Sequence, residues 1–196
     1  MKKLLFALII IVTGCKTSRE SFSTKPTTNL TANGKLFASF FQQRAAEYDA
    51  LCFQAYNIAH IRLNEALQKS NEKPLAIITD IDETVLDNSP YAVKQSLNGK
   101  DYEQTSWEEW TNTAQADTIA GAVSFYKYAA SKGVKIFYVT NRSESERVAT
   151  LKNLVKWNFP DATNDQLILR GTVSSKESRR QSIAEKYEIC LLIGDN

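Results

Sequence analysis

Leu75-Ala-Ile-Ile-Thr-Asp-Ile-Asp-Glu-Thr84 is the stretch that decides the fold. Residues 75–79 are apolar or β-branched, which predicts a short buried strand. Asp80 and Asp82 follow at its end, and residues two apart in a strand project to the same side. Two neighbouring carboxylates repel each other unless a cation lies between them. An apolar strand that ends in Asp-x-Asp is therefore a candidate metal and phosphoryl site, although solvated turns often contain the same pair.

Composition limits the class of protein. The chain has 196 residues, 43% of them hydrophobic, which suits one medium-sized α/β domain with a small appendage. Its 24 basic and 22 acidic side chains nearly balance, which argues against a dedicated binder of nucleic-acid polymers. Three cysteines are too few and too scattered for a disulfide framework or a zinc cluster. His60 is the single histidine, so mechanisms that need two histidines are excluded.

Residues 1–14 have the features of a lipoprotein signal peptide. Two lysines precede nine apolar residues, 4–12, and this run is too short to span a bilayer. The segment leads into Val12-Thr-Gly-Cys15, which resembles a bacterial lipobox. The resemblance implies cleavage before Cys15 and acylation of that cysteine. An ordinary secretory signal followed by a chance cysteine is the alternative.

The lipobox also sets the expected location. Lys16 follows the cysteine where an inner-membrane retention signal would have aspartate. We therefore expect a lipid-anchored protein of the bacterial cell envelope, held at the outer membrane. Residues 15–34 are rich in Ser, Thr, Lys and Asn and have little apolar surface to bury, which predicts a flexible tether.

The rest of the chain is expected to form a helical region and an α/β core. Within the helical region, 35–73, apolar spacings of three and four indicate an amphipathic helix over 36–69, with a break near Gln43. Residues 74–196 alternate strand-like and helical patterns, which predicts a parallel sheet. The expected strands are 75–79, 134–139, 167–169 and 189–193. Because ordinary βα loops have about two to six residues, the stretch 88–117 is interpreted as an inserted cap.

Polar residues follow each expected strand, directly or a few residues on. In chain order they are Asp80, Asp82, Thr140, Asn141, Lys176 and Asp195. Ligands of an open parallel sheet bind beyond the carboxyl ends of its strands, so we expect these side chains to converge there. Taken singly, Thr140 could cap a helix, and Lys176 could belong to a solvated basic face with Arg179 and Arg180.

The order and kinds of these residues resemble the four motifs of the haloacid dehalogenase (HAD) superfamily. Residues 80–84 match its D-x-D-x-T motif. The longer run Asp80-Ile-Asp-Glu-Thr-Val-Leu-Asp-Asn-Ser-Pro-Tyr91, and the W-x-x-W spacing of Trp107 and Trp110, are similar to class C acid phosphatases, a family of lipoprotein 5′-nucleotidases. The resemblance implies a HAD-like Rossmannoid α/β fold of three layers, with a parallel sheet, an N-terminal helical extension and a small cap insertion.

The chemistry of the aspartates agrees with the resemblance. A phosphate monoester is an anion, so Mg²⁺ held by Asp80 and Asp195 would screen its repulsion from an attacking carboxylate. Asp80 would be the nucleophile and form an aspartyl-phosphate. Asp82 would protonate the leaving group and then deprotonate the hydrolytic water. In the family, the backbone carbonyl at the Asp82 position also binds the metal.

Neutral donors and cations complete the expected catalytic set. Thr140 and Asn141 would hydrogen-bond the phosphoryl oxygens, and Lys176 would offset their growing charge and restrain Asp80. For Arg142, a phosphate contact and a structural ion pair are both open.

Substrate contacts are expected from the cap. Tyr91 is the first candidate for an aromatic side chain that faces the substrate, and Trp107 is a second that could stack on a base. Asn88 is expected to shape the turn or to bind substrate hydroxyls. The class C resemblance implies small phosphomonoesters, such as nucleoside 5′-monophosphates or nicotinamide mononucleotide.

Two other functions remain open. One is a surface lipoprotein that keeps the HAD fold only to bind a ligand, and intact Asp80 and Asp82 weigh against it. The other is a phosphotransferase. The oligomeric state is also open, a homodimer included. Class C relatives continue past Gly194-Asp-Asn196 with a further acidic residue, so we expect this sequence to be truncated at its C-terminus.

Overall fold

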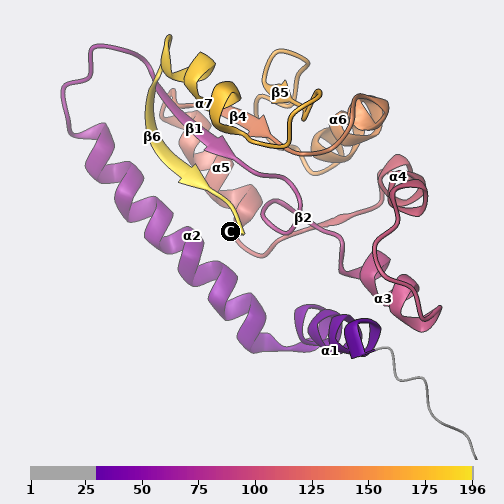
Figure 1. Ribbon diagram of the computed structural model, residues 1–196. Helices are drawn as coiled ribbons and strands as arrows, with labels where there is room; N and C mark the ends of the chain where they lie inside the picture. Colours follow the sequence, from indigo (N-terminus) through magenta and orange to yellow (C-terminus); the bar gives the residue numbers. More distant parts are fainter. Residues whose placement is uncertain (1–29, 196) are drawn as a thin grey trace, which may run out of the picture.

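The computed structural model describes residues 30–195, so the expected signal peptide and Cys15 lie outside the described part of the chain. The α-helices are α1 Leu30–Arg44, α2 Ala46–Leu67, α3 Ser89–Leu97, α4 Gln104–Asn112, α5 Ala122–Ser131, α6 Arg147–Lys156 and α7 Glu177–Ala184, with a 3₁₀ turn, η1, at Glu144–Glu146. The strands are β1 Leu75–Thr79, β2 Leu86–Asp87, β3 Asp117–Thr118, β4 Lys135–Val139, β5 Leu167–Ile168 and β6 Glu188–Ile193. Figure 1 shows their arrangement.

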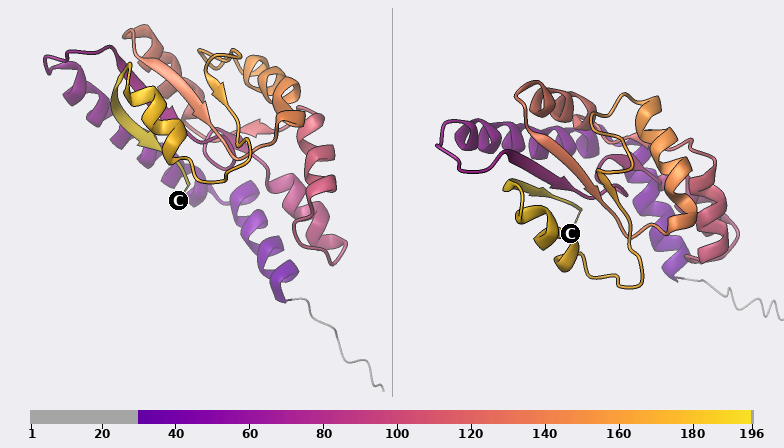
Figure 2. Two further views of the ribbon diagram at one scale, coloured as in Figure 1. Left: turned by 45° about the horizontal axis from the view of Figure 1, so that its top comes forward. Right: turned by 90° about the horizontal axis from the view of Figure 1, so that it is seen from above.

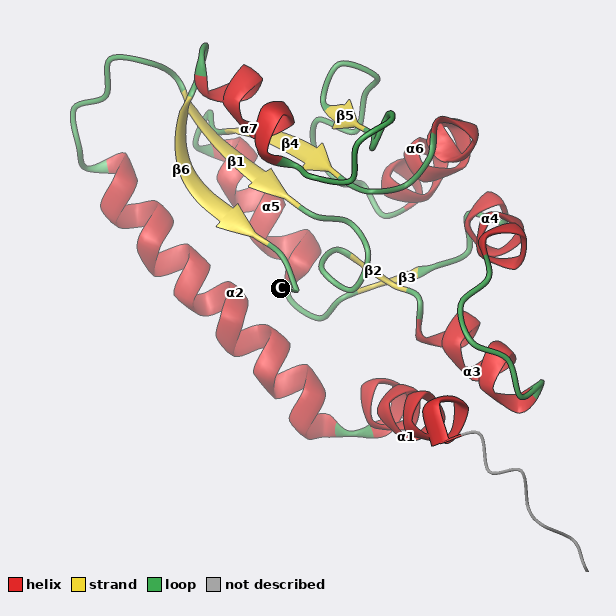
Figure 3. Ribbon diagram, viewed as in Figure 1, coloured by secondary structure: helices red, strands yellow, loops and turns green. Residues whose placement is uncertain are grey.

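A four-stranded parallel sheet forms the centre of the structure, in the order β5-β4-β1-β6. Figure 3 shows β1, β4 and β6 running in the same direction. β1 lies between β4 and β6, with Thr79 level with Tyr138 on one side and Ile193 on the other. Because these strands end at the same edge, the residues that follow them are brought together there.

Side chains of β1 alternate between two hydrophobic clusters. Ile77 packs into the larger cluster with buried side chains of α2, α5 and α6. Ala76 and Ile78 face the other way, into a smaller cluster that contains Ile183 of α7. Figure 2 shows α7 on the face of the sheet opposite α2 and α5. The predicted three-layer α/β fold with a parallel sheet is therefore confirmed.

The N-terminal helical region has the break that was predicted near Gln43. It consists of two helices separated at Ala45, whose extended backbone (φ −90°, ψ 120°) interrupts the helical hydrogen bonding. α1 begins at Leu30, inside the segment expected to be a flexible tether. The last five residues of that segment are therefore helical, and α1 as a whole packs against α3. Phe37 and Phe40 of the predicted apolar face are 74% and 66% exposed.

α2 connects the helical region to the Asp-x-Asp loop. Leu63 is fully buried, and the buried Tyr56 donates a hydrogen bond of 2.7 Å to the Thr84 carbonyl oxygen. Gly121, at the start of α5, lies against the Tyr56 ring, and a Cβ atom added to it would be only 3.2 Å from a ring carbon. Its φ of +86° also favours glycine. None of the helices in residues 30–195 has the length and apolar character needed to cross a membrane.

The stretch 88–117 forms a small helical insertion on a two-stranded stalk. β2 and β3 pair antiparallel, Leu86 opposite Thr118, and α3 and α4 lie between them in the chain. α4 reaches the core domain through Thr111, whose hydroxyl donates to the buried Glu146 carboxylate at 2.8 Å. The insertion therefore leaves the core directly after the Asp-x-Asp loop and returns to contact the segment that follows β4.

Candidate active site

Asp80 lies directly after β1, with its backbone held by the sheet. Its amide donates to the Ile193 carbonyl oxygen of β6 at 2.9 Å. Its own carbonyl oxygen accepts a 2.8 Å bond from Thr79 Oγ1, which in turn accepts one from Tyr126 at 2.6 Å. Tyr126 is fully buried, so the position of Asp80 is set by packing in the core.

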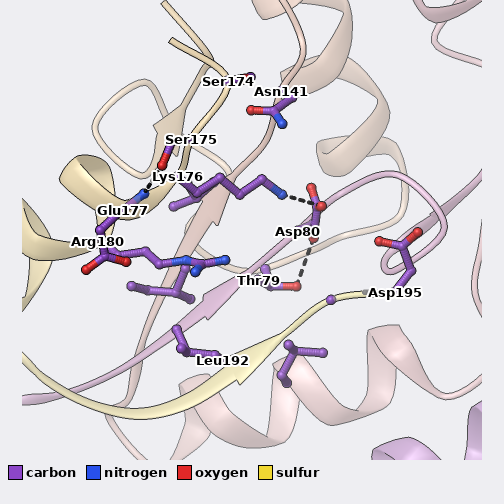
Figure 4. Close-up of a pocket in the computed structure, with 14 residues that line it drawn as sticks. Thr79, Asp80, Asn141, Ser174, Ser175, Lys176, Glu177, Arg180, Leu192 and Asp195 are labelled. Carbon is purple, nitrogen blue, oxygen red and sulfur yellow. Dashed lines mark hydrogen bonds and ion pairs between the residues drawn. The ribbon is translucent and has the colours of Figure 1, made fainter.

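The Asp80 carboxylate forms an ion pair with Lys176. The lysine, at the start of α7, extends across the cavity so that its Nζ meets Asp80 Oδ2 (Figure 4). Both side chains are largely shielded, at 19% and 15% exposed. Asp80 Oδ1 accepts from the Ile81 amide at 2.8 Å. The structure therefore brings together two residues that lie 96 positions apart and that the sequence assigned to one site.

Asp82 is held by a different set of donors. Arg142 reaches its Oδ1 with Nε at 3.0 Å and Nη2 at 2.7 Å, and Asn88 Nδ2 donates to the same oxygen at 2.9 Å. The Arg142 side chain is 1% exposed, and its Nη1 donates to Thr150 at 3.0 Å. Of the two roles left open for Arg142, the structure shows the ion pair, since the guanidinium lies in the interior beside Asp82.

Thr140 follows β4, but its hydroxyl faces Asp82 rather than open space. Thr140 Oγ1 donates to Asp82 Oδ2 at 3.4 Å and accepts from the Arg142 amide at 3.1 Å. Thr140 is fully buried. The predicted contact between its hydroxyl and phosphoryl oxygens is therefore replaced here by a role in holding Asp82.

Arg179 is a site residue that sequence reasoning missed, because the sequence placed it on a solvated basic face. Its Nη1 donates to the Thr140 carbonyl oxygen at 2.6 Å, and its Nη2 donates to Asn141 Oδ1 at 2.8 Å. Burial lowers the pKa of Arg179, and the Asp80 carboxylate opposes that shift. Because guanidinium has only donors, it bonds the Asn141 amide through the amide oxygen, which leaves the amide nitrogen to donate elsewhere.

A cavity of about 510 Å³ joins the residues that follow the strands. Its polar lining includes Asp80, Asn141, Lys176 and Asp195. Asp82 and Thr140 do not line it. Figure 4 shows Lys176 and Asp80 meeting inside the cavity, with Asp195 on the other side of Asp80. The geometry thus brings together two carboxylates, a cation and an amide.

The predicted metal ligands are only partly assembled. In the part of the chain that the structure describes, no three Asp, Glu, His or Cys side chains are grouped so as to hold a metal. The Asp82 carboxylate faces Arg142, so its side chain is not a ligand here, and only its backbone carbonyl is left for that role. Asp80 and Asp195 do share one cavity, and carboxylate and carbonyl oxygens suit Mg²⁺. The donor set therefore fits that ion.

The expected substrate contacts from the cap lie around a second cavity. Tyr91, Asn88 and Trp107 line a space of about 240 Å³ that Asp80 does not reach. Tyr91 is only 6% exposed, its hydroxyl lies 3.1 Å from Ser106 Oγ, and its ring meets Trp107 edge-on at 5.2 Å. Its aromatic character was misread as substrate binding, because its polar end is used to fasten α3 to α4.

Asn88 also differs from its prediction as a substrate contact. It is 3% exposed, and both polar atoms of its amide are engaged, with Asp82 and with Trp110 Nε1. Trp107 is half-buried, and the Arg142 guanidinium carbon lies 5.9 Å from the centre of its ring.

Glu83 is a further group that the sequence did not single out. It has a positive φ of 54°, and its Oε1 accepts a 2.9 Å bond from the Asn88 amide. Burial, with a smaller effect of the neighbouring Asp82 charge, raises the pKa of Glu83 to about 7. A glutamate in the middle of an acidic motif gives no sequence signal of burial, which depends on the fold of the loop.

Comparison with known proteins shows the family of this chain. The model of the HAD superfamily, subfamily IIIB acid phosphatases, matches residues 12–196. The chain belongs to this family. Two crystal structures of the class C acid phosphatase from Bacillus anthracis are similar to it. One is 39% identical with a TM-score of 0.80, covering 84% of this chain and 69% of that one. The other is 40% identical with a TM-score of 0.78, covering 82% and 67%.

Curated proteins from plants are similar to part of the chain. Acid phosphatase 1 from Solanum lycopersicum is 29% identical over 126 residues, which is 60% of this chain and 49% of that protein. A stem 31 kDa glycoprotein from Glycine max is 31% identical over the same length, with the same coverage. The chain therefore spans about half the length of these curated relatives.

Replacing Arg179 tests whether it orients the phosphatase site. We expect Arg179→Met to weaken binding of orthophosphate about tenfold, because the Asn141 amide loses the partner that fixes its orientation. Calorimetric titration in the presence of Mg²⁺ measures this change. Arg62→Met, which removes an exposed guanidinium of α2, is the control. Equal phosphate affinity in Arg179→Met and the control would show that Arg179 does not orient the site.

Glu83 should make stability depend on pH. Because its folded-state pKa of about 7 lies above the ordinary value of 4.5, the folded protein keeps a proton that the unfolded chain releases. The free energy of unfolding should therefore fall as pH rises from about 4.5 to 7. We expect Glu83→Gln to gain on the order of 3 kcal/mol over wild type across that interval. Urea denaturation in metal-free buffer measures it.

The exposed Glu47→Gln of α2 is the matched control for this titration. It should follow the wild-type pH profile. Parallel profiles for Glu83→Gln and wild type would contradict the assignment, because the pH-dependent loss would then arise elsewhere.

Proposed function

We propose that this protein is a Mg²⁺-dependent phosphomonoesterase that works through an aspartyl-phosphate. The ion pair between Lys176 and Asp80, at the end of β1 and inside the 510 Å³ cavity, is the observation that best supports this reaction. A carboxylate held at a strand end beside a cation suits in-line attack on an anionic phosphoryl group. The related Bacillus anthracis enzyme was solved with tungstate bound, a tetrahedral oxyanion like phosphate.

Asp80 attacks the phosphorus atom in the first step. A bond forms between its carboxylate oxygen and phosphorus, while the bond from phosphorus to the ester oxygen breaks. Lys176 holds Asp80 Oδ2 from one side, and the Ile81 amide holds Oδ1, so the carboxylate is oriented before substrate arrives. Lys176 and the amide nitrogen of Asn141 then donate to the phosphoryl oxygens as charge develops on them.

Asp82 acts as acid and then as base. In the first step its proton passes to the departing ester oxygen, and in the second it takes a proton from the water that attacks the aspartyl-phosphate. Arg142, Asn88 and Thr140 hold its carboxylate in one orientation. The reaction returns Asp80 unchanged and releases inorganic phosphate.

Asp80 and Asp195, with the backbone carbonyl of Asp82, would hold the metal. When bound there, Mg²⁺ supplies Lewis-acid polarisation of a phosphoryl oxygen and screens the charge of the attacking carboxylate. The oxygen donors and the shared cavity of the two aspartates support this assignment.

We propose nucleoside 5′-monophosphates or nicotinamide mononucleotide as the substrate class. Trp107 of the cap, which is half-buried, is the aromatic side chain that we propose for contact with a base. Stacking of this kind is worth about 1–3 kcal/mol for each base. Tyr91 and Asn88 are fastened inside the insertion, so they support the cap rather than contact the base.

Turnover tests the proposed reaction. We expect the mature protein with Mg²⁺ to release phosphate from small monophosphates. Asp80→Asn should lose at least about a thousandfold in rate, because an amide cannot replace the nucleophile. EDTA should abolish turnover, and added Mg²⁺ should restore it. The exposed Asp165→Asn should keep full activity. Undiminished activity in Asp80→Asn would remove the nucleophile assignment, and a wild type inactive on every monoester would remove the function.

We also propose that the protein is anchored in the outer membrane of the bacterial cell envelope through acylated Cys15. Acyl chains give firm attachment because each buried methylene adds about 0.8 kcal/mol. Mass spectrometry of the N-terminal peptide should therefore give a chain that begins at Cys15 and carries the added acyl mass. Cys15→Ser should move the protein from the membrane to the soluble fraction. An unmodified N-terminus at another residue would contradict the anchor.

A further inference from the structure

A chain of two hydrogen bonds runs from the inserted helix α4 to Asp82. Trp110 Nε1 donates to Asn88 Oδ1 at 2.9 Å, and Asn88 Nδ2 donates to Asp82 Oδ1 at 2.9 Å. Asn88 is 3% exposed, and the Glu83 carboxylate holds its backbone amide at 2.9 Å. The asparagine is thus fixed at its backbone and at both ends of its side chain.

The two hydrogen bonds, to Trp110 and to Asp82, fix the orientation of the Asn88 side-chain amide. An indole N–H can only donate, so the asparagine must turn its oxygen towards Trp110. Asp82 Oδ1 accepts from the Arg142 guanidinium and so carries no proton of its own, which means that the amide must turn its nitrogen towards it. If the indole donor is removed, the amide oxygen keeps no partner on that side, and a flipped amide would place its oxygen against the Asp82 carboxylate.

The same helix also contacts the second support of Asp82. Trp107, one turn before Trp110, lies 5.9 Å from the Arg142 guanidinium carbon, and Arg142 is paired with Asp82. Thr111 fastens α4 to Glu146 at 2.8 Å. Asn88 and Arg142, two of the groups that hold the Asp82 carboxylate, therefore both contact α4.

We propose that Trp110 is a positioning residue for the reaction, which acts through Asn88 to hold Asp82 where it can protonate the leaving group. This inference rests on the proposed phosphomonoesterase function. Trp110 touches neither Asp80 nor the cavity that contains it. Its influence is therefore confined to the step in which Asp82 transfers a proton.

Esters whose leaving groups differ in basicity distinguish the proton-transfer step from the rest of the reaction. An alkyl phosphate releases a strongly basic alkoxide, which needs a proton from a well-placed acid. A 2,4-dinitrophenyl phosphate releases a weakly basic phenolate, which leaves without one. A displaced Asp82 should therefore slow the first ester and spare the second, whereas general damage to the fold should slow both.

Trp110→Phe is the sharpest variant, because it keeps the aromatic ring and removes only the indole N–H. We expect kcat for an alkyl phosphate to fall about tenfold or more, with KM unchanged, and kcat for 2,4-dinitrophenyl phosphate to change less than about twofold. Trp157→Phe is the matched control, because it removes an indole bond of 3.0 Å to the Ala116 carbonyl oxygen, away from Asp82. It should leave both rates as in wild type.

A second variant tests whether Trp110 acts on Asp82 through Asn88. Asn88→Ala should show the same selective loss, and the double variant should lose no more than Asn88→Ala alone, because the two residues act as one unit. Equal losses with both esters, no loss with either, or additive losses in the double variant would overturn the proposal.

The side-chain amide resonances of Asn88 provide a readout that does not need turnover. They should shift in Trp110→Phe and stay in place in Trp157→Phe, and unshifted resonances in Trp110→Phe would overturn the proposal. If the wild type hydrolyses neither ester, the proposed function fails, and these resonances decide the positioning role by themselves.

Discussion

The repulsion between Asp80 and Asp82 is the constraint on which the rest of the structure depends. Two carboxylates that follow one strand two residues apart cannot both be shielded from water unless each has its own partner. Lys176 from α7 meets Asp80, and Arg142 from the end of β4 meets Asp82. The fold separates two like charges by giving each a different cation.

The order of the strands makes this separation possible. β1 lies between β4 and β6, so the loop after β1 is bordered by segments that come from both halves of the chain. Arg142 arrives from the β4 side and Asp195 from the β6 side, while Lys176 enters from the opposite face of the sheet with α7. Asn88, at the start of the inserted helices, then bonds Asp82, while Asp80 lines the cavity. The two carboxylates thereby have different surroundings, one beside the cavity and the other among the donors that hold it.

The sequence predicts the parts of this arrangement that depend on local patterns. Short apolar runs with polar residues after them located β1, β4, β5 and β6, and the strand-end rule placed Asp80, Asn141, Lys176 and Asp195 around one cavity. Such features need only neighbouring residues and the direction of the strands.

Contacts between side chains from distant segments could not be predicted in the same way. Tyr91 and Asn88 are polar residues beside a motif, and only the packing of α3 on α4 shows that their polar atoms are already bonded inside the protein. Arg179 looked solvated because its partners, Thr140 and Asn141, are about forty positions earlier in the chain. Donor and acceptor geometry of this kind depends on rotamers, which a single sequence does not encode in any local pattern.

The pairing of charges also bears on why metal and substrate should depend on each other. The single positive charge of Lys176 offsets the negative charge of Asp80. Asp195 adds a second negative charge to the lining of the same cavity, and Lys176 is not paired with it. Arg142 contributes little to a ligand there, because it is buried and paired with Asp82. A phosphomonoester dianion therefore approaches carboxylates that are no more than partly neutralised. In the proposed reaction a divalent cation between Asp80 and Asp195 would make the local charge positive. Binding of the metal ion would then strengthen binding of the phosphomonoester, and binding of the phosphomonoester would strengthen binding of the metal ion.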